Sequence, residues 1–169
     1  NYKDGKKDGK WAEWYTNGQI KFEGNHKEDN RDGKFTSWYD DGQKKSVLNF
    51  KDGKKDGNCT LWHSNGQKDF EANYKEGNEV GKVTLWYENG QIEQEGNYKN
   101  GEDGNFTSWY KNGQKHTEGK YINGKKEGKW TEWYENGNKK SEENFKNDKL
   151  DGKVTLWDEN HQKKTELNY

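Results

Sequence analysis

The sequence predicts an all-β fold: an elongated antiparallel β-meander of tandem hairpin repeats, arranged as a single-layer or half-wrapped twisted sheet. Three observations predict it. A block of about 24 residues recurs along the chain, two Gly-containing turns punctuate each block, and β-branched and aromatic residues lie between the turns. A helix is not expected, because each glycine in a helix interior costs about 1 kcal/mol.

The repeats define the organisation of the chain. Seven blocks span 1–24, 25–48, 49–72, 73–96, 97–119, 120–143 and 144–167, and the fifth is one residue shorter than the others. We expect a single repeat domain over 1–169 with about two strands in each repeat. Each repeat of such an array contacts mainly its neighbours.

Four positions of the repeat are restricted in the residues they hold: one is always glycine, one is always tryptophan, one is apolar and one is almost always aromatic. A glycine recurs at Gly9, Gly33, Gly57, Gly81, Gly104, Gly128 and Gly152. Five residues later a tryptophan recurs at Trp14, Trp38, Trp62, Trp86, Trp109, Trp133 and Trp157. An apolar position between them holds Trp11, Phe35, Cys59, Val83, Phe106, Trp130 and Val154. A fourth position holds Tyr2, His26, Phe50, Tyr74, Tyr98, Tyr121, Phe145 and Tyr169.

The two turns of each repeat decide which residues share a face of the sheet. One turn is Asp-Gly or Asn-Gly, as at Asp4-Gly5, and the other is Asn-Gly, as at Asn17-Gly18. A two-residue turn at Asn-Gly would put Trp11, Tyr15, Ile20 and Phe22 on one face. A three-residue turn with a Gly bulge would put Trp14, Ile20 and Phe22 together instead. We favour the bulge, because it groups the Trp of every repeat with the Tyr2 position.

Composition narrows the classes of protein. Hydrophobic residues make up 24% and charged residues 36%, which is in the disordered range, but the net charge is only -1 and 15% of the residues are aromatic. These rings supply a thin core. No apolar run reaches the ~20 residues of a membrane helix, and one cysteine excludes an internal disulfide. Arg31 is the one arginine among 30 basic residues, which disfavours nucleic-acid recognition.

A known repeat family resembles this pattern. Residues 121–137 read Tyr-Ile-Asn-Gly-Lys-Lys-Glu-Gly-Lys-Trp-Thr-Glu-Trp-Tyr-Glu-Asn-Gly. This segment resembles the bacterial variant of the MORN repeat, found in proteins of the YwqK-type antitoxin family, and the resemblance covers the whole chain. It implies an interaction scaffold. Four residues depart from the pattern and leave local turn geometry open: Asp29 and Asp148 in Gly positions, Asp158 in place of Tyr, and His161 after Asn160.

No residues point to catalysis, a metal or a cofactor. The four histidines fall at four different positions of the repeat: His26, His63, His116 and His161. Cys59 occupies the apolar position, so we expect a buried, unreactive thiol. The acidic loop that begins at Asp52 has Lys54 where an EF-hand needs an oxygen ligand, so turn chemistry explains it better than calcium. We therefore expect a protein that is not an enzyme.

The aromatic positions are the features of the sequence that suggest a function. Trp and Tyr dominate interface hot spots, so we expect a protein-binding scaffold whose partner contacts Trp62, Trp86, Tyr87, Trp109 and Tyr110, with the two tyrosines facing solvent. Neutralisation is the favoured role, as an antitoxin, an immunity protein or a phage-encoded anti-defence inhibitor such as an anti-CRISPR. The alternative is a structural or surface module that binds lipid headgroups, glycans or an assembly partner. We expect a cytoplasmic monomer, or a secreted one if a signal peptide has been removed, with no nucleic-acid partner and a weaker case for a membrane surface.

Overall fold

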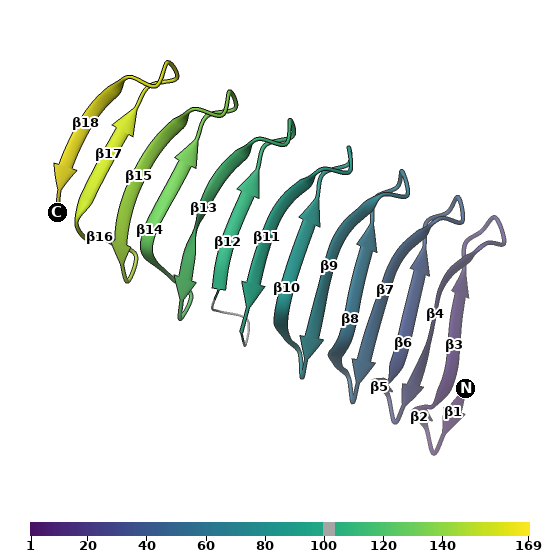
Figure 1. Ribbon diagram of the computed structural model, residues 1–169. Coiled ribbons are helices and arrows are strands. Elements are labelled where there is room, and N and C mark those ends of the chain that lie inside the picture. The colour runs from purple at the N-terminus through teal and green to yellow at the C-terminus, as the bar shows by residue number, and fades with distance from the viewer. Residues whose placement is uncertain (100–103) are drawn as a thin grey trace. The chain divides into compact units, whose positions relative to one another are not determined.

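The computed structural model describes residues 1–99 and 104–169, and these residues form strands and turns without a helix (Figure 1). Contacts between residues divide the chain into an N-terminal part, Asn1–Val80, and a C-terminal part, Gly81–Tyr169. In both parts each long strand pairs antiparallel with the long strands before and after it in sequence, and neither part closes on itself. The predicted all-β meander of hairpins is confirmed.

The strands follow the two-per-repeat prediction, with four two-residue strands added at the hairpin ends. The N-terminal part contains β1 (Tyr2–Lys3), β2 (Lys6–Lys7), β3 (Gly9–Trp14), β4 (Ile20–Lys27), β5 (Asn30–Arg31), β6 (Gly33–Trp38), β7 (Lys44–Lys51), β8 (Lys54–Trp62) and β9 (Lys68–Lys75). After β10 (Asn78–Trp86), whose first residues belong to the N-terminal part, come β11 (Ile92–Tyr98), β12 (Gly104–Trp109), β13 (Lys115–Ile122), β14 (Lys125–Trp133), β15 (Lys139–Lys146), β16 (Lys149–Leu150), β17 (Lys153–Trp157) and β18 (Lys163–Asn168).

The Asp-Gly turns are two-residue hairpins in which both central residues have positive φ. Asp52 and Gly53 have φ of 50° and 80°, between the paired residues Lys51 and Lys54. This is the type I′ geometry that matches the twist of the flanking strands. The two aspartates in Gly positions keep the same backbone: Asp29 has φ 69° and Asp148 has φ 67°.

Each of these two aspartates also gains hydrogen bonds that a glycine cannot make. The Asp29 carboxylate accepts the Lys7 backbone N–H at 2.7 Å, and the Asp148 carboxylate accepts that of Lys126 at 2.7 Å. Asp is one of the few residues besides Gly that tolerate the left-handed region, and here each carboxylate also bonds to the backbone of the preceding repeat. The departures from the repeat therefore leave the turns intact.

The Asn-Gly turns are three-residue loops closed by two backbone hydrogen bonds. The Gly18 N–H donates to the Tyr15 carbonyl at 3.0 Å, and the Tyr15 N–H donates to the Gln19 carbonyl at 2.8 Å. Gly18 takes the left-handed conformation with φ 84°, which is the Gly-bulge turn. The favoured three-residue turn is confirmed.

A second bulge follows this turn and alters the predicted faces. Trp14 pairs with Ile20, but Glu13 pairs with Phe22, so Lys21 is the extra residue of β4. The same register shift recurs in the other Asn-Gly hairpins, for example between Ser108 and Trp109. Because an extra residue reverses the alternation of side chains, Phe22 lies on the opposite face from Trp14 and Ile20. The prediction that these three residues share a face is wrong.

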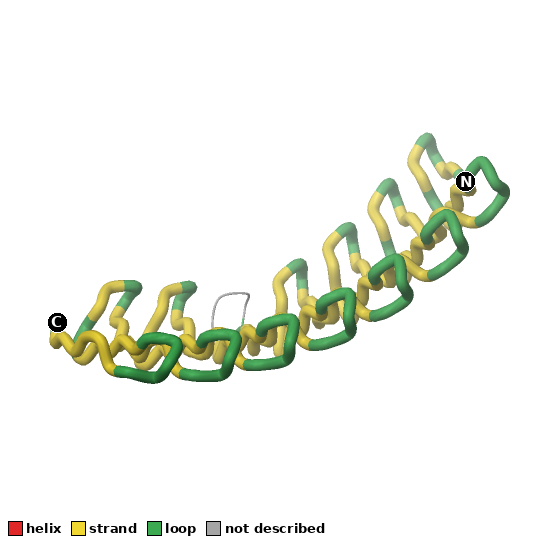
Figure 2. Tube along the Cα trace, turned by 90° about the horizontal axis from the view of Figure 1, so that it is seen from above, coloured by secondary structure: helices red, strands yellow, loops and turns green. Residues whose placement is uncertain are grey.

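The strands form a single layer (Figure 2). Aromatic rings from two repeat positions form the core of each part, on one face of this layer. The apolar position and the Tyr2 position contact each other, and not the recurring Trp as predicted. In the N-terminal part the chain of rings has centroid separations of 5.3–5.9 Å and runs through Tyr2, Trp11, His26, Phe35 and Phe50. In the C-terminal part it joins Phe106, Tyr121, Trp130 and Phe145.

Small residues on neighbouring strands make room for these rings. A Cβ added at Gly24 would lie 2.3 Å from the Phe35 ring, and one added at Gly119 would lie 2.2 Å from the Trp130 ring. Cys59 lies in the same row and is 2% exposed. Burial raises the pKa of its thiol, so the predicted burial of Cys59 is confirmed and its thiolate is disfavoured.

Candidate functional site

The five residues predicted to bind a partner lie where strands run into the Asn-Gly turns. Trp62, Trp86 and Trp109 end β8, β10 and β12, and Tyr87 and Tyr110 each follow one of these strands. All five are half-buried. Successive residues of an extended chain point to opposite faces, so the tyrosines and the tryptophans do not share a face. We call the two sides the Tyr face, which carries the aromatic core, and the Trp face.

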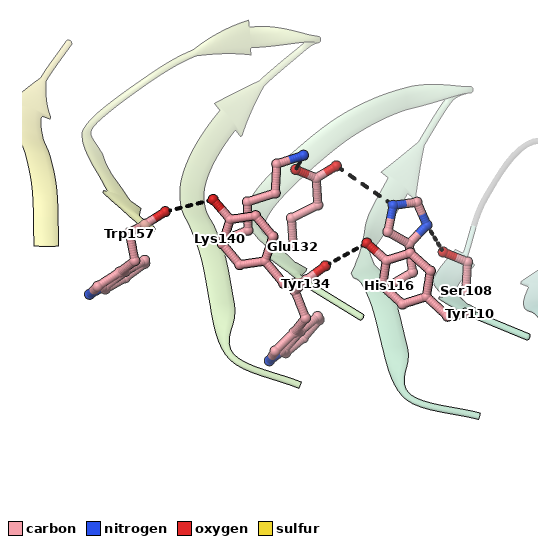
Figure 3. Close-up of polar contacts among 8 residues, drawn as sticks. Ser108, Tyr110, His116, Glu132, Tyr134, Lys140 and Trp157 are labelled. Carbon is pink, nitrogen blue, oxygen red and sulfur yellow. Dashed lines mark hydrogen bonds and ion pairs between the residues drawn. The ribbon is translucent and has the colours of Figure 1, made fainter. Parts of the chain in front are cut away.

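The tyrosines join consecutive repeats. In the C-terminal part the hydroxyl of Tyr87 donates to the Trp109 carbonyl at 2.8 Å, and that of Tyr110 donates to the Trp133 carbonyl at 2.8 Å. Figure 3 shows the Tyr110 bond and the equivalent 3.0 Å bond from Tyr134 to Trp157. Burial raises the pKa of Tyr87 and of Tyr110. The expectation that Tyr87 and Tyr110 face solvent is therefore wrong, because their hydroxyls tie one repeat to the next.

The N-terminal part contains the same ties. Tyr15 donates to the Trp38 carbonyl at 2.8 Å, and Tyr39 donates to the Trp62 carbonyl at 2.7 Å. Sequence reasoning missed this role. The signal available was the recurrence of Tyr directly after Trp, which also fits an exposed aromatic row.

The Asn-Gly turns form a second row of ties. The Asn112 side-chain amide donates to the Glu135 carbonyl at 2.9 Å, in the next turn along the chain, while its oxygen accepts the Gln114 N–H at 2.9 Å. Asn89 and Asn136 make the same pair of contacts. One side chain thus closes its own turn and holds the next, which fixes the spacing of the repeats at this edge.

The Trp face of the C-terminal part carries an alternating pattern of lysine and glutamate. Glu142 binds Lys129 at 2.8 Å and Lys139 at 2.5 Å. Ion pairs of this pattern involve six lysines and four glutamates: Lys82, Lys115, Lys129, Lys139, Lys153 and Lys163, with Glu95, Glu118, Glu142 and Glu166. Within this set of ion pairs, lysines therefore outnumber glutamates by two.

Hydrogen bonding from lysine perturbs two of these carboxyl groups. Bonds from Lys129 and Lys139 hold the pKa of Glu142 below its usual range. Bonds from Lys153 and Lys163 lower the pKa of Glu166 to about 2. Both glutamates are therefore ionised at neutral pH, and each is held between two cations.

This face has shallow hollows. One of about 250 Å³ is lined by Trp157, Thr155, Asn144 and Glu142, together with Lys129, Lys153 and Lys163. Another, of about 180 Å³, lies beside Lys82, Glu95 and Thr107. Half-buried indole rings with lysine stems between them give a corrugated surface, and the Lys115 ammonium lies 5.6 Å from the centre of the Trp133 ring.

The Tyr face holds a polar cluster that contains the residue types of a hydrolytic triad (Figure 3). His116 Nδ1 lies 3.5 Å from Ser108 Oγ, and His116 Nε2 lies 4.0 Å from a Glu132 oxygen. Glu132 binds Lys140 more closely, at 3.0 Å, and this contact raises the pKa of Lys140. A triad needs contacts of about 2.6–3.2 Å and a carboxylate that orients the histidine. This cluster satisfies neither condition.

The acidic loop that begins at Asp52 lies within the described residues and does not form a metal site. Among residues 1–99 and 104–169, no three His, Cys, Asp or Glu side chains are grouped as ligands for a metal ion. The Asp56 carboxylate of the acidic loop instead accepts the Glu76 N–H and pairs with Lys75 at 3.2 Å. In the same described ranges, no helix has the length and apolar character needed to span a membrane.

Hairpins of one pattern, tied to their neighbours through Tyr and Asn, define a β-repeat protein. Six consecutive segments match the family described as MORN repeat variant: residues 7–28, 31–52, 55–76, 79–100, 102–123 and 126–147. The chain therefore belongs to the MORN repeat variant family. No curated protein matches the chain in sequence.

Proposed function

We propose that this protein is a non-enzymatic scaffold that binds an acidic surface of a protein partner through the Trp face of its C-terminal part. The observation that carries the proposal is the row of half-buried indoles at Trp86, Trp109, Trp133 and Trp157, framed by six lysines and four glutamates. Aromatic anchors supply most of the affinity of typical interfaces, and charges around them contribute to partner choice and association rate.

The repeat ties support this function. The Tyr110 hydroxyl and the Asn112 amide fix consecutive repeats through backbone carbonyls, so the indoles of the Trp face are held at a constant spacing before any partner arrives. Preorganised surfaces lose less conformational entropy on binding. A long row of anchors that already have their bound spacing suits a large flat partner better than a small ligand.

Charge favours a protein over a nucleic acid as the partner. Each glutamate of the face already binds at least one lysine, and Glu142 and Glu166 each bind two. A phosphate backbone placed against the lysines would also meet these carboxylates, whose charge repels it. A protein surface with both charges, and an excess of acidic residues, matches the pattern.

The finer form of the proposal is neutralisation. The scaffold would act as an antitoxin or immunity protein that blocks a toxin, or as a phage-encoded inhibitor of a host defence nuclease, as an anti-CRISPR does. The resemblance to YwqK-type antitoxins and the preorganised surface support this role. Co-expression with the product of the neighbouring gene tests it. Rescue of growth from that product supports neutralisation, and toxicity that persists despite binding removes it.

The binding proposal is tested with a partner identified by pull-down and mass spectrometry and then purified. We expect Trp109→Ala/Trp133→Ala to weaken binding at least tenfold in calorimetry, because the Trp side chains are lost while the carbonyls that accept the tyrosine bonds remain. The matched control is Thr117→Ala on the Tyr face, which we expect to bind with unchanged affinity. Equal affinity of the double variant and the wild type would remove the Trp face as the site. Capture of lipid vesicles or glycans in place of a protein would overturn the proposal.

A further inference from the structure

We propose that the N-terminal part binds a small aromatic anion, a flat ring system carrying a carboxylate or phosphate, in a pocket on its Tyr face. The pocket has a volume of about 370 Å³, and its lining residues fall between Lys7 and Leu48. This volume lies in the range of small-molecule sites, about 300–1,000 Å³. The site belongs to the N-terminal part, whereas the proposed protein-binding surface belongs to the C-terminal part, so this inference does not depend on that function.

The pocket exists because two facing side chains are small. Ser37 of β6 pairs with Ser46 of β7, and both line the pocket. In the next hairpin the same two positions are Leu61 and Phe70, which also pair with each other. Two serines therefore leave open the space that a leucine and a phenylalanine occupy one repeat later.

Aromatic side chains form the walls. Trp11, Phe22 and Phe35 line the pocket, and Leu48 adds an aliphatic surface. The His26 ring lies between two of the walls, with its centre 5.9 Å from that of Trp11 and 5.3 Å from that of Phe35. Rings of this kind offer edge and face contacts to a flat aromatic ligand.

Two cations line the same pocket. The Lys7 ammonium lies 4.7 Å from the centre of the Trp11 ring, and the Arg31 guanidinium lies 5.3 Å from that of Phe35. Burial and then the charges of Lys7 and Arg31 lower the pKa of His26. The histidine is thus neutral near pH 7, and its shift is consistent with a positive potential in the pocket.

The carboxylates near the pocket are already paired. Glu13 lines the pocket but forms an ion pair with Lys21 at 3.4 Å. Asp29 accepts the Lys7 backbone N–H at 2.7 Å. The lining therefore contains two cations and a single carboxylate, which is already in an ion pair. This excess of positive charge favours an anionic ligand. Arg31 also suits a carboxylate or phosphate, because its guanidinium donates two parallel hydrogen bonds to them.

Hydroxyl groups of the lining can orient such a ligand. The Ser37 and Ser46 hydroxyls lie 2.6 Å apart, and one donates to the other, which leaves the second hydrogen for a ligand. His26 Nδ1 is too buried to contact a ligand directly, so the histidine contributes the face and edge of its ring.

The contact of a cation with the aromatic core is by itself a feature of the repeat and not of this site. Lys55, at the position of Arg31 in the next repeat, lies 4.6 Å from the centre of the Tyr74 ring. What distinguishes the pocket is the space left by Ser37 and Ser46, combined with His26 and two cations. Lys55 therefore provides a matched control.

Calorimetry of the full chain tests the proposal with indole-3-carboxylate and adenosine 5′-monophosphate as probes, and with indole, adenosine and inorganic phosphate as their separate halves. We expect at least one aromatic anion to bind with 1:1 stoichiometry and at least tenfold more tightly than its neutral ring, and adenosine 5′-monophosphate, if it binds, to exceed inorganic phosphate by the same factor. The probe that binds more tightly distinguishes carboxylate from phosphate. Absence of saturable binding by both anions at millimolar concentration, or equal binding of the neutral ring, would overturn the proposal.

Variants locate the site. We expect Arg31→Gln to weaken binding at least tenfold and Lys55→Gln to leave it unchanged. Ser37→Leu/Ser46→Phe copies the next hairpin and should abolish binding while circular dichroism stays that of a β-sheet. Amide chemical shifts of the wild-type chain give a readout that does not depend on any variant. Titration with the probe that binds more tightly should change the amide shifts of Ser37 and Ser46 more than those of residues in the C-terminal part. Full affinity in the filled variant, or shifts confined to other residues, would show that the pocket is not the site.

Discussion

Trp130 and Trp133 lie three residues apart on β14, yet they belong to opposite faces of the C-terminal part and differ in burial and in contacts. Trp130, on the Tyr face, is 4% exposed and its ring contacts Phe106, Tyr121 and Phe145. Trp133, on the Trp face, is half-buried under the Lys115 side chain, and its backbone carbonyl accepts the Tyr110 hydroxyl. The recurring Trp of the repeat is therefore the more exposed of the two.

This difference shows how a single layer of strands obtains both stability and a free surface. The Tyr face packs rings from neighbouring strands edge to face, and such contacts are worth about 0.5–1.5 kcal/mol per pair beyond the area they bury. The Trp face is covered by ion pairs in which the lysines are largely exposed and the glutamates exposed or half-buried, and solvent-accessible pairs are worth about 0–1 kcal/mol each. We infer that the Tyr face stabilises the fold, while substitutions on the Trp face leave it folded.

The largest expected effect is the loss of the Trp130 ring. Trp130→Ala should lower the free energy of unfolding by about 3–5 kcal/mol, the usual range for a buried aromatic ring. Trp133→Ala should cost about 1 kcal/mol, because its side chain is half-exposed in the folded state. Urea melts of the two variants measure the difference. Equal losses in the free energy of unfolding would contradict the inference that the Tyr face stabilises the fold more than the Trp face.

A smaller effect is expected at the glycine under the Trp130 ring. A methyl group at Gly119 would lie 2.2 Å from that ring, so Gly119→Ala should cost about 1–3 kcal/mol, as is usual for an overpacked core. The neighbouring exposed residue provides the control: Lys120→Ala should change stability by less than about 0.5 kcal/mol. Thermal melts that show the two variants to be alike would mean that the ring moves aside freely.

The tie between repeats is expected to contribute less than the ring packing. Tyr110→Phe keeps the ring and removes the hydroxyl that donates to the Trp133 carbonyl at 2.8 Å. The expected loss is about 0.5–1.5 kcal/mol, the net worth of one hydrogen bond. Tyr134→Phe should cost a similar amount, and the two losses should add in the double variant because the bonds have different acceptors. Unchanged urea midpoints would show that the hydroxyls are not ties.

The sequence alone predicted the features that depend on neighbouring residues. The meander and the positions of its turns follow from glycines and from Asn-Gly and Asp-Gly pairs, whose backbone preferences act over four residues. Burial of Cys59 followed from its place in the apolar row. The three-residue turn was also predicted, since it is one of two common solutions for such a hairpin.

Features that depend on an extra residue within a strand, and so on the pairing register, were not predicted. The second bulge, at Lys21 and its equivalents, has no sequence signature, and it reverses the face of every residue that follows it in the strand. The split of the five predicted site residues between two faces has a simpler origin: Trp86 and Tyr87, like Trp109 and Tyr110, are adjacent in sequence, and successive residues of an extended chain point to opposite faces. The pocket beside Ser37 and Ser46 could not be foreseen either, because their pairing is known only once this bulge is placed.

The smallest expected effect is on the Trp face and depends on pH. The pKa of Glu142 lies below its ordinary value of 4.5 in the folded chain, because Lys129 and Lys139 bond to the carboxylate. A lowered pKa means that the contribution to stability is present above about pH 4.5 and is lost as the pH falls through the folded value. Glu142→Gln should therefore cost about 0.2–1 kcal/mol at pH 7, because its lysine partners are partly exposed to solvent, and clearly less near pH 2. Urea melts at both pH values measure this. A loss at pH 2 as large as that at pH 7 would show that Glu142 acts through packing instead of charge.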